Sequence, residues 1–186
     1  MATRNLHAPL LTAEEFLEIE FPSDTKAELD NGIIRMMAGG TRRHAEIQGN
    51  IFNLLRNALR GSGCKPFGPD LGVRTNDLAI RYPDITVVCG NQSSEDESKA
   101  VSDPRAVVEV LSPSTRAIDL GTKLLEYRSI PSVTTIIFVD PSLETVRLIE
   151  RTGAAAWSDS DLSPSQDVPI ADLGITLPHA EIFARD

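Results

Sequence analysis

The segment AVVEVLSPSTRAIDLGTKLLEYRSIPSVTTIIFVD, residues 106–140, contains two apolar runs separated by a helical stretch. AVVEVL and TTIIFVD, like ITVV at 85–88, are apolar at consecutive positions, which is typical of central strands covered on both faces. SPST at 112–115 precedes a helix that we expect over about 116–129. This order predicts an α/β or α+β sandwich built on a mixed β-sheet flanked by helices.

Glu109 lies in the middle of the first apolar run, where a sheet normally buries an aliphatic side chain. An ionised carboxylate is costly to desolvate unless it is paired or bound to a metal, so such a residue is usually exposed at a sheet edge or functional. An edge strand would alternate apolar and polar residues, and Val107, Val108, Val110 and Leu111 do not. We therefore interpret Glu109 as a functional carboxylate.

The first sixty residues predict a short helix, a hairpin and a long helix. Thr12-Ala13-Glu14-Glu15 is a capping box for a helix over about 13–20. KAELDNGIIRMM, residues 26–37, contains two strand-like runs around Asp30-Asn31-Gly32, a strong hairpin signal. Residues 43–60 place their apolar side chains on one helical face, and Gly61 follows as a C-terminal stop.

Later residues indicate several strands. Between residues 64 and 90, the short β-type runs CKPFG, LGVRT, LAIRY and DITVVCG are broken by Gly, Pro and Asn. We expect an acidic loop over 91–104, a strand in ETVRLIE at 144–150 and a loop over 152–167. Residues 173–184 carry no pattern that we can assign.

A chain of 186 residues, 41% of them hydrophobic, suffices for one substantial core. We expect a single domain over 1–186, with its core at about 12–150 and a C-terminal extension at 151–186. No apolar run resembles a signal peptide or reaches the roughly 20 residues of a membrane span, so we expect a cytoplasmic protein without membrane contact. Cys64 and Cys89 lie outside any CxxC or Cys/His cluster, and we expect reduced structural thiols rather than a disulfide or a zinc site.

The net charge of −9 argues against nucleic-acid binding, because phosphate backbones favour a positive surface. The charge is unevenly distributed, however. Residues 35–81 contain eight Lys and Arg against three acids, a local charge of +5, whereas acids gather in SSEDES at 93–98 and from Asp159 onward. The basic stretch is either a nucleic-acid contact or simply a solvated helix face.

Asp84, Glu109 and Lys123 form a candidate constellation. Asp84 follows Pro83 and opens the run ITVV, and Asp119, Lys123 and Tyr127 share one helix face opposite Leu120 and Leu124. If the strands of Asp84 and Glu109 are neighbours, the two acids can share a hard cation such as Mg²⁺. The ion can polarise a phosphoryl oxygen and activate a bound water, and a Lys ammonium can stabilise the charge that develops.

The combination of a Pro-Asp before one apolar strand and a Glu within the next resembles the PD-(D/E)XK nuclease superfamily. RYPDITVV, VVEVLSPST and DLGTKLLEY, followed by IPSVTTIIFVDP, resemble the Uma-type family of restriction-endonuclease-like proteins. AELDNG, RRHAEIQGNIFNLL and ITLPHAEIF match the layout of that family, so the resemblance covers nearly the whole chain. It implies a restriction-endonuclease-like core, with Asp84 and Glu109 as metal-binding acids and Glu28 as a third.

The chain departs from this pattern at two places. Leu111 occupies the position of the superfamily's Lys two residues after the Glu, so the basic role is expected to move to Lys123. Asn31-Gly32-Ile33 replaces the family's usual Asp-Gly-Glu and removes two carboxylates from the hairpin. Weaker metal binding or loss of activity is a consequence to test.

Two hypotheses follow from these residues. The first is an endonuclease that depends on Mg²⁺ or Mn²⁺ and hydrolyses phosphodiester bonds in DNA. The second is a catalytically weak or inactive member of the same fold, a homodimeric module that binds nucleic acid or a protein. Leu111, the lost hairpin acids and the acidic balance favour the second hypothesis.

Several residues have a plain alternative to a functional role. Asp84 could be a turn residue, with Pro69-Asp70 as the relevant Pro-Asp, and Lys123 could pair with Asp119 on a solvated helix face. The remaining candidates for substrate contact have structural alternatives in helix capping and packing. They are His44, Ser112, Ser114, Asp119 and Tyr127.

Overall fold

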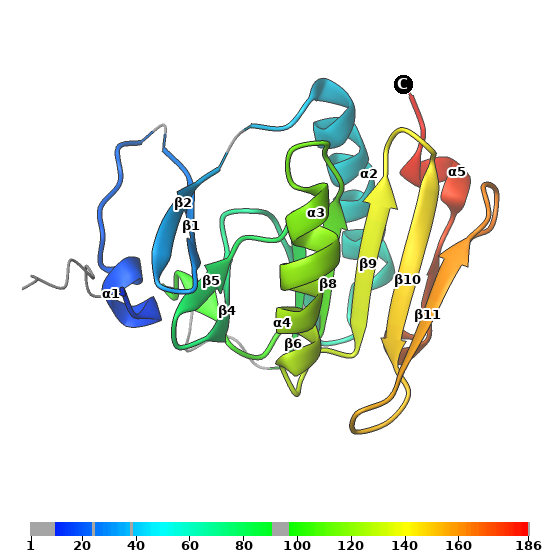
Figure 1. Cartoon of the computed structure of the whole chain (residues 1–186). Helices are drawn as coiled ribbons and strands as arrows, with labels where there is room; N and C mark the ends of the chain where they lie inside the picture. The colour runs from blue at the N-terminus through cyan, green and yellow to red at the C-terminus, as the bar shows by residue number, and fades with distance from the viewer. Residues whose placement is uncertain (1–9, 24, 38, 91–96, 186) are drawn as a thin grey trace, which may run out of the picture.

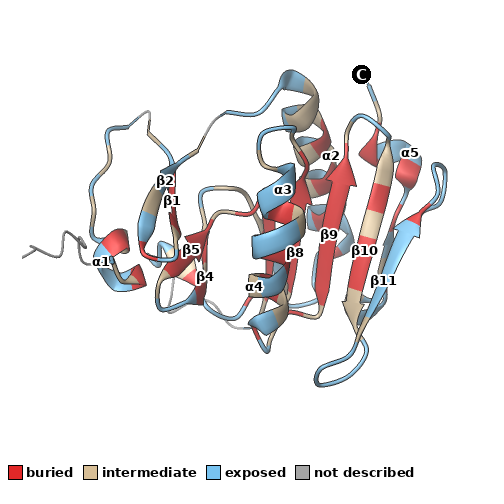
Figure 2. Ribbon diagram, in the orientation of Figure 1, coloured by how far each residue is buried: buried red, intermediate tan, exposed pale blue. Residues whose placement is uncertain are grey.

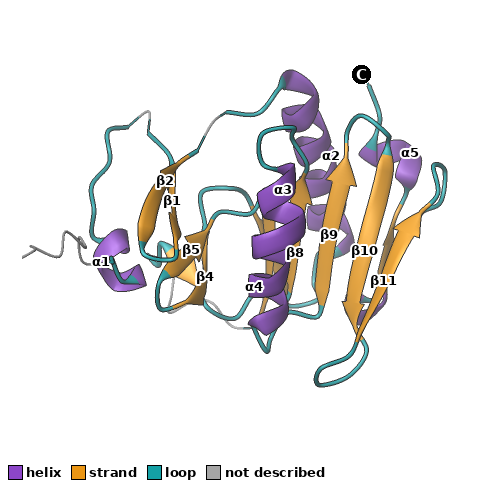
Figure 3. Cartoon of the chain, in the orientation of Figure 1, coloured by secondary structure: helices purple, strands orange, loops and turns teal. Residues whose placement is uncertain are grey.

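The computed structural model describes residues 10–23, 25–37, 39–90 and 97–185. Most strands lie in two sheets (Figures 1 and 3). The larger sheet has the order β11 (Trp157–Leu162), β10 (Thr145–Arg151), β9 (Thr135–Asp140), β8 (Ala106–Val110), β6 (Ile85–Cys89) and β3 (Cys64–Phe67). The smaller sheet has the order β2 (Ile33–Met36), β1 (Ala27–Asp30), β5 (Ala79–Arg81), β4 (Gly72–Asn76) and β7 (Ala100–Val101).

The larger sheet is mixed, because β8 and β9 pair in parallel and its other strand pairs are antiparallel. Helix α2 (Arg42–Ala58) covers the face behind the sheet in Figure 1, and the helix that follows β8 covers the front face. Alternate residues of a strand point to opposite faces, so both sets of β8 side chains are buried. Figure 2 shows β8 and β9 buried along their lengths, which confirms the predicted central strands.

The helix after β8 is continuous but not uniform. It consists of α3 (Arg116–Ile118), the π-helical turn η1 (Asp119–Lys123) and α4 (Leu124–Ser129). These bounds agree with the predicted helix over 116–129. The π turn is a local widening that is frequent at functional sites, and it contains both Asp119 and Lys123.

The predicted hairpin and capping box are both present. Helix α1 (Ala13–Leu17) begins after a reciprocal bond pair in which the Glu15 N–H donates to Thr12 Oγ1 and the Thr12 N–H donates to the Glu15 carboxylate. The helix ends three residues before the predicted bound. Asn31 and Gly32 form the turn between β1 and β2 with φ values of 48° and 77°, as a two-residue hairpin turn with two positive φ values requires.

Two predicted loops contain strands instead. β11 lies within 152–167 and pairs with β10 at the edge of the larger sheet, so that loop prediction was wrong. Ser158, Asp159, Ser160 and Asp161 are all exposed, so both faces of this edge strand are largely solvated, and its sequence WSDSDL therefore carries little apolar signal. β7 lies within the expected acidic loop, of which residues 91–96 are outside the described part of the chain.

The C-terminal residues pack against α2. β12 (Val168–Ile170) and β13 (Ile175–Leu177) form a small antiparallel pair around the 3-10 turn η2 (Ala171–Leu173). Helix α5 (His179–Ile182) follows, and Ile182 and Phe183 join the apolar core on the α2 side of the larger sheet. Within the described residues, the model contains no helix with the length and apolar character that membrane crossing requires.

The expectation of free thiols was wrong, since Cys64 and Cys89 form a disulfide. They lie directly opposite each other where β3 and β6 pair antiparallel. Cross-strand neighbours have close Cβ atoms, and this proximity depends on a strand pairing that the spacing of the cysteines does not reveal.

Replacing Cys64 by Ser is expected to lower the free energy of unfolding by about 3 kcal/mol, because the unfolded chain loses a covalent loop closure. Guanidinium denaturation with and without a reductant measures this difference. The reductant should lower the midpoint of the wild type and leave that of the variant unchanged. A wild-type midpoint that does not change when both thiols become titratable would contradict the expectation.

Candidate functional site

The strand register brings Asp84 and Glu109 together. Ile85 pairs with Val108 and Thr86 with Val107 between β6 and β8. Continuing this antiparallel register by one residue places Asp84 opposite Glu109, and such neighbours have Cβ atoms about 5 Å apart. The two strands are therefore neighbours in the way that a shared site requires.

A pocket of about 310 Å³ lies beside these two strands. It is bounded by the N-terminal turn of α2, the loop before α3 and the π turn. Six of the predicted residues line it: Asp84, Glu109, Lys123, His44, Ser112 and Asp119. Glu28 and Ser114 line an adjoining pocket, which Asp119 and Lys123 share.

Asp84 is held by both neighbouring elements. Its Oδ2 accepts a hydrogen bond from the Val110 N–H of β8 at 2.7 Å, and its Oδ1 lies 2.9 Å from Nε2 of His44 in α2. Gln48 Nε2 also donates to the Asp84 carbonyl oxygen at 3.0 Å. The hydrogen bond to Asp84 raises the pKa of His44, so this histidine acts on Asp84 as well as lining the pocket.

Glu109 is 4% exposed, which excludes the edge-exposed alternative. Its Oε1 accepts hydrogen bonds from Lys123 Nζ at 3.1 Å and from the Tyr127 hydroxyl at 2.6 Å. Burial raises the pKa of Glu109 to about 8, against the opposing influence of the Lys123 charge. Its second oxygen, Oε2, forms no hydrogen bond with a described residue, and Glu109 is among the residues that line the pocket.

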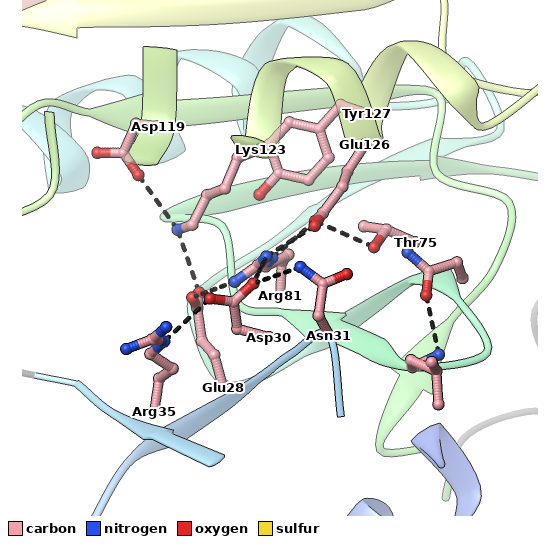
Figure 4. Close-up of polar contacts among 12 residues, drawn as sticks. Glu28, Asp30, Asn31, Arg35, Thr75, Arg81, Asp119, Lys123, Glu126 and Tyr127 are labelled. Carbon is pink, nitrogen blue, oxygen red and sulfur yellow. Dashed lines mark hydrogen bonds and ion pairs between the residues drawn. The ribbon is translucent and has the colours of Figure 1, made fainter. Parts of the chain in front are cut away.

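Lys123 is buried among three carboxylates. Its Nζ lies 3.1 Å from Glu28 Oε1, 3.1 Å from Glu109 Oε1 and 3.3 Å from Asp119 Oδ1. Figure 4 shows Glu28 and Asp119 on two sides of the ammonium. Burial would lower the pKa of Lys123, but these three charges outweigh it and raise the pKa, so the ammonium stays charged. The solvated-face alternative for Lys123 was therefore wrong.

Lys123 also connects the two sheets. Glu28 belongs to β1 of the smaller sheet, and Glu109 belongs to β8 of the larger one. Glu28 is fixed in turn by the Tyr82 N–H, which donates to Glu28 Oε1 at 3.1 Å. Glu28 therefore positions Lys123 in this structure, and it does not line the pocket that contains Asp84.

Arg81 is a buried cation next to the candidate site that the sequence did not lead us to expect. It is 1% exposed and bridges the end of β5 to three carboxylates (Figure 4). Its nearest contacts are at 2.7 Å, to Glu126 and Asp30, and Glu28 lies at 3.5 Å. Burial opposes its charge, but these acids raise the pKa of Arg81 further. The sequence did contain a signal for a buried cation, since Arg81 lies inside the apolar run LAIRY, which directly precedes Pro83-Asp84.

The buried charges do not balance. Five carboxylates surround only two buried cations among the described residues, Arg81 and Lys123, while Arg35 pairs with Asp30 from the surface. The carboxylates are those of Glu28, Asp30, Glu109, Asp119 and Glu126. Asp119 Oδ1 is buried without a hydrogen-bond partner in the described part of the chain, at ion-pair distance from Lys123. Burial raises the pKa of Asp119 as well as that of Glu109, so protonation relieves part of this excess of acid.

The remaining predicted residues have local roles. Ser112 Oγ accepts from the Thr115 N–H and contacts the hydroxyls of Ser114 and Thr115, so it closes the turn before α3. The N-cap residue of α3, Thr115, makes no side-chain cap hydrogen bond with a described residue, so the capping alternative is not confirmed. Tyr127 is fully buried behind Glu109 and positions that carboxylate instead of lining the pocket. Asp70 forms an exposed ion pair with Lys26, and the structure places Asp84, not Asp70, beside Glu109.

The fold and the pocket define the class of this protein: a mixed α+β fold of the restriction-endonuclease-like type, with acids near the ends of two adjacent strands and a lysine on the helix that follows the second strand. A family model named Uma2, described as "Putative restriction endonuclease", matches residues 13–179, and the chain belongs to this family. The resemblance noted in the sequence is thereby confirmed.

The chain is also similar to other proteins. Two uncharacterized proteins of Synechocystis sp. are each 28% identical to the chain, over 90% and 82% of its length and 88% of theirs. A crystal structure from Anabaena variabilis, described as a "putative nuclease", aligns with a TM-score of 0.75. It covers 93% of this chain and 97% of that one at 16% identity, and thus confirms the fold.

Proposed function

We propose that this protein is an endonuclease that hydrolyses phosphodiester bonds in DNA with the help of Mg²⁺ or Mn²⁺. The observation that carries the proposal is the lining of one pocket by Asp84, Glu109 and Lys123. Membership of the Uma2 family and a nuclease-like fold support the reaction class.

The residues of the pocket fit a hard divalent cation. No group of three or more His, Cys, Asp or Glu side chains among the described residues is arranged around one metal position. Mg²⁺ does not need such a group, since it usually takes one or two carboxylates and keeps several waters. Asp84 and Oε2 of Glu109 would hold the ion. Glu28, which was expected as a third ligand, holds Lys123 instead.

In the proposed reaction, each residue has a distinct task. A bound cation would polarise the phosphoryl oxygen and lower the pKa of a bound water. Lys123 places a permanent positive charge at the pocket wall, where it stabilises negative charge that develops on the phosphate. His44 and the Val110 N–H hold Asp84, while Tyr127 and Lys123 hold Glu109.

The basic stretch of the sequence supports a DNA partner in part. Three arginines of this stretch are exposed and can contact phosphates: Arg42 and Arg56 on α2, and Arg60 just after it. Arg81 instead forms ion pairs with acids inside the protein. Purified protein should therefore nick or cut DNA when Mg²⁺ or Mn²⁺ is present and stop when a chelator is added. Absence of cleavage with either metal, on both single-stranded and duplex DNA, would contradict the proposal.

Metal affinity is expected to rise with pH and to level off above about pH 8, because the Glu109 carboxyl must lose its proton to bind a cation. Calorimetric titration of Mn²⁺ from about pH 6 to about pH 9 measures this dependence. Glu109→Gln should abolish it, and Glu181→Gln, which changes an exposed glutamate of α5, should not. The proposal would not survive a wild-type affinity that is the same across this range.

A second candidate function is a non-catalytic homodimeric module that binds nucleic acid or a protein. It is favoured by the two hydrogen bonds that Glu109 Oε1 accepts from Lys123 and Tyr127, because these bonds stabilise the buried carboxyl without a metal ion. Exposed Ile33 and Met36 on the edge strand β2 offer a surface for a second copy. Unchanged thermal stability on addition of Mn²⁺ to the wild type would favour this candidate.

A further inference from the structure

A second pocket, of about 180 Å³, lies beside the proposed reaction site. The residues that line it include two aromatic residues, Phe21 and Tyr82, and two apolar ones, Met37 and Pro69. Each of these four side chains is half-buried, so part of its apolar surface faces the pocket. Lys26 and Asp70, which form an exposed ion pair at 2.6 Å, supply polar groups to the same pocket.

This second pocket adjoins the site pocket of about 310 Å³. Lys26, Met37, Pro69 and Tyr82 line both. Tyr82 is two residues from Asp84 in the chain, and its N–H is bonded to Glu28, which holds Lys123. The same framework therefore fixes the positions of the second pocket and of the acids and lysine of the site.

The chemistry of the second pocket matches a nucleobase. Aromatic rings provide stacking surfaces, which every base can use. The Lys26 ammonium is a donor and the Asp70 carboxylate an acceptor, as the hydrogen-bonding edge of a base requires. Their ion pair is solvent-exposed and worth little, so it can open at small cost. A base joined to a phosphate in the site pocket is within reach of this position.

We propose that the second pocket binds one unpaired nucleobase next to the scissile phosphate, so that the substrate is single-stranded DNA or DNA with an extruded base. This inference rests on the proposed endonuclease function. A paired base in an intact duplex is stacked on both sides and cannot enter such a pocket without leaving the helix. An unpaired base enters without that cost.

Cleavage rates on three DNA substrates of one sequence test the inference: a single strand, a duplex with a one-nucleotide bulge and a perfect duplex. The first two should be cut at least about tenfold faster than the third. Tyr82→Ala should lower the rate on the first two about tenfold or more, since loss of base stacking has about that effect. Tyr82→Phe, which keeps the ring, should recover most of the rate. Trp157→Ala, which removes a partly exposed ring from β11, is the matched control.

A binding measurement separates failure of the inference from failure of the proposed function. Glu109→Gln protein is mixed with single-stranded DNA that carries the fluorescent base 2-aminopurine, and the fluorescence should change in a manner that Tyr82→Ala abolishes. Equal cutting of all three substrates, with Tyr82→Ala as active as the wild type, overturns the inference and leaves the endonuclease intact. If no DNA is cut, the endonuclease proposal fails. A fluorescence signal that is absent or independent of Tyr82 then overturns the inference as well.

Discussion

Glu109→Gln should lower the rate of metal-dependent DNA cleavage about a thousandfold. The amide is nearly isosteric with the protonated carboxyl and can still accept from Lys123 and Tyr127, so the fold is expected to persist. A neutral amide is a poor ligand for a hard cation, so the variant should lose the transition-state stabilisation that the bound ion provides. A thousandfold lower rate corresponds to a loss of about 4 kcal/mol. The measurement is the single-turnover rate on a labelled oligonucleotide.

Asp84→Asn should produce a loss of similar size, because the two acids are proposed to hold the same ion. Asp161→Asn and Glu181→Gln change exposed acids on β11 and α5 and serve as matched controls that retain the wild-type rate. Circular dichroism spectra should be the same for all four variants. Wild-type cleavage by both Glu109→Gln and Asp84→Asn would remove the assignment of this pocket as the active site.

Arg81→Met is expected to have the largest effect on stability, a loss of about 4 kcal/mol in the free energy of unfolding. The substitution leaves Glu126, Asp30 and Glu28 without their buried cation, and uncompensated buried charge is costly. Urea denaturation at neutral pH measures the loss. Arg35→Met is the control: that side chain is 59% exposed, and removal of a surface pair should cost less than about 1 kcal/mol.

The deficit of Arg81→Met should shrink in acid. Burial tends to raise the pKa of Asp30, but hydrogen bonds from Arg81 and Arg35 outweigh it and hold the pKa below its usual value. A carboxyl with a depressed pKa stabilises the folded state at neutral pH, and this contribution disappears as the pH falls through its folded pKa. The wild type therefore loses stability that the variant already lacks. A deficit that is constant from neutral to acidic pH would argue that Arg81 acts through packing alone.

Much of the candidate site could be predicted because Glu109 is a carboxylate within an apolar strand sequence. A carboxylate inside an apolar run, a Pro-Asp before another run and a lysine on the next helix could all be read from the sequence, and the structure gathers them in one pocket. The Arg81 contacts could not be predicted, because its partners belong to β1 and α4, 45 or more residues away. Only tertiary pairing brings these charges together.

Two further misses have a similar cause. β11 lacks an apolar pattern because it is an edge strand whose faces are largely solvated, and pairing with β10 decides its conformation. The cysteines are linked because β3 and β6 are neighbours in the sheet, which their separation in the chain does not show. Local propensity predicted α2, the helix after β8, the start of α1 and the hairpin, since these depend on contacts near in sequence, whereas α5 was not predicted.

Lys123 lies between Glu28 of the smaller sheet and Glu109 of the larger one. The rate of the proposed DNA cleavage should therefore depend on residues remote from the pocket. Val73 of β4 belongs to the same buried apolar cluster as Val88 of β6 and Val107 of β8, and Lys123 bridges the two sheets that this cluster joins. A misplacement of about 1 Å can cost a hundredfold in rate. If the proposed endonuclease function holds, small changes of side-chain volume in this cluster should change the cleavage rate without altering any residue of the site pocket.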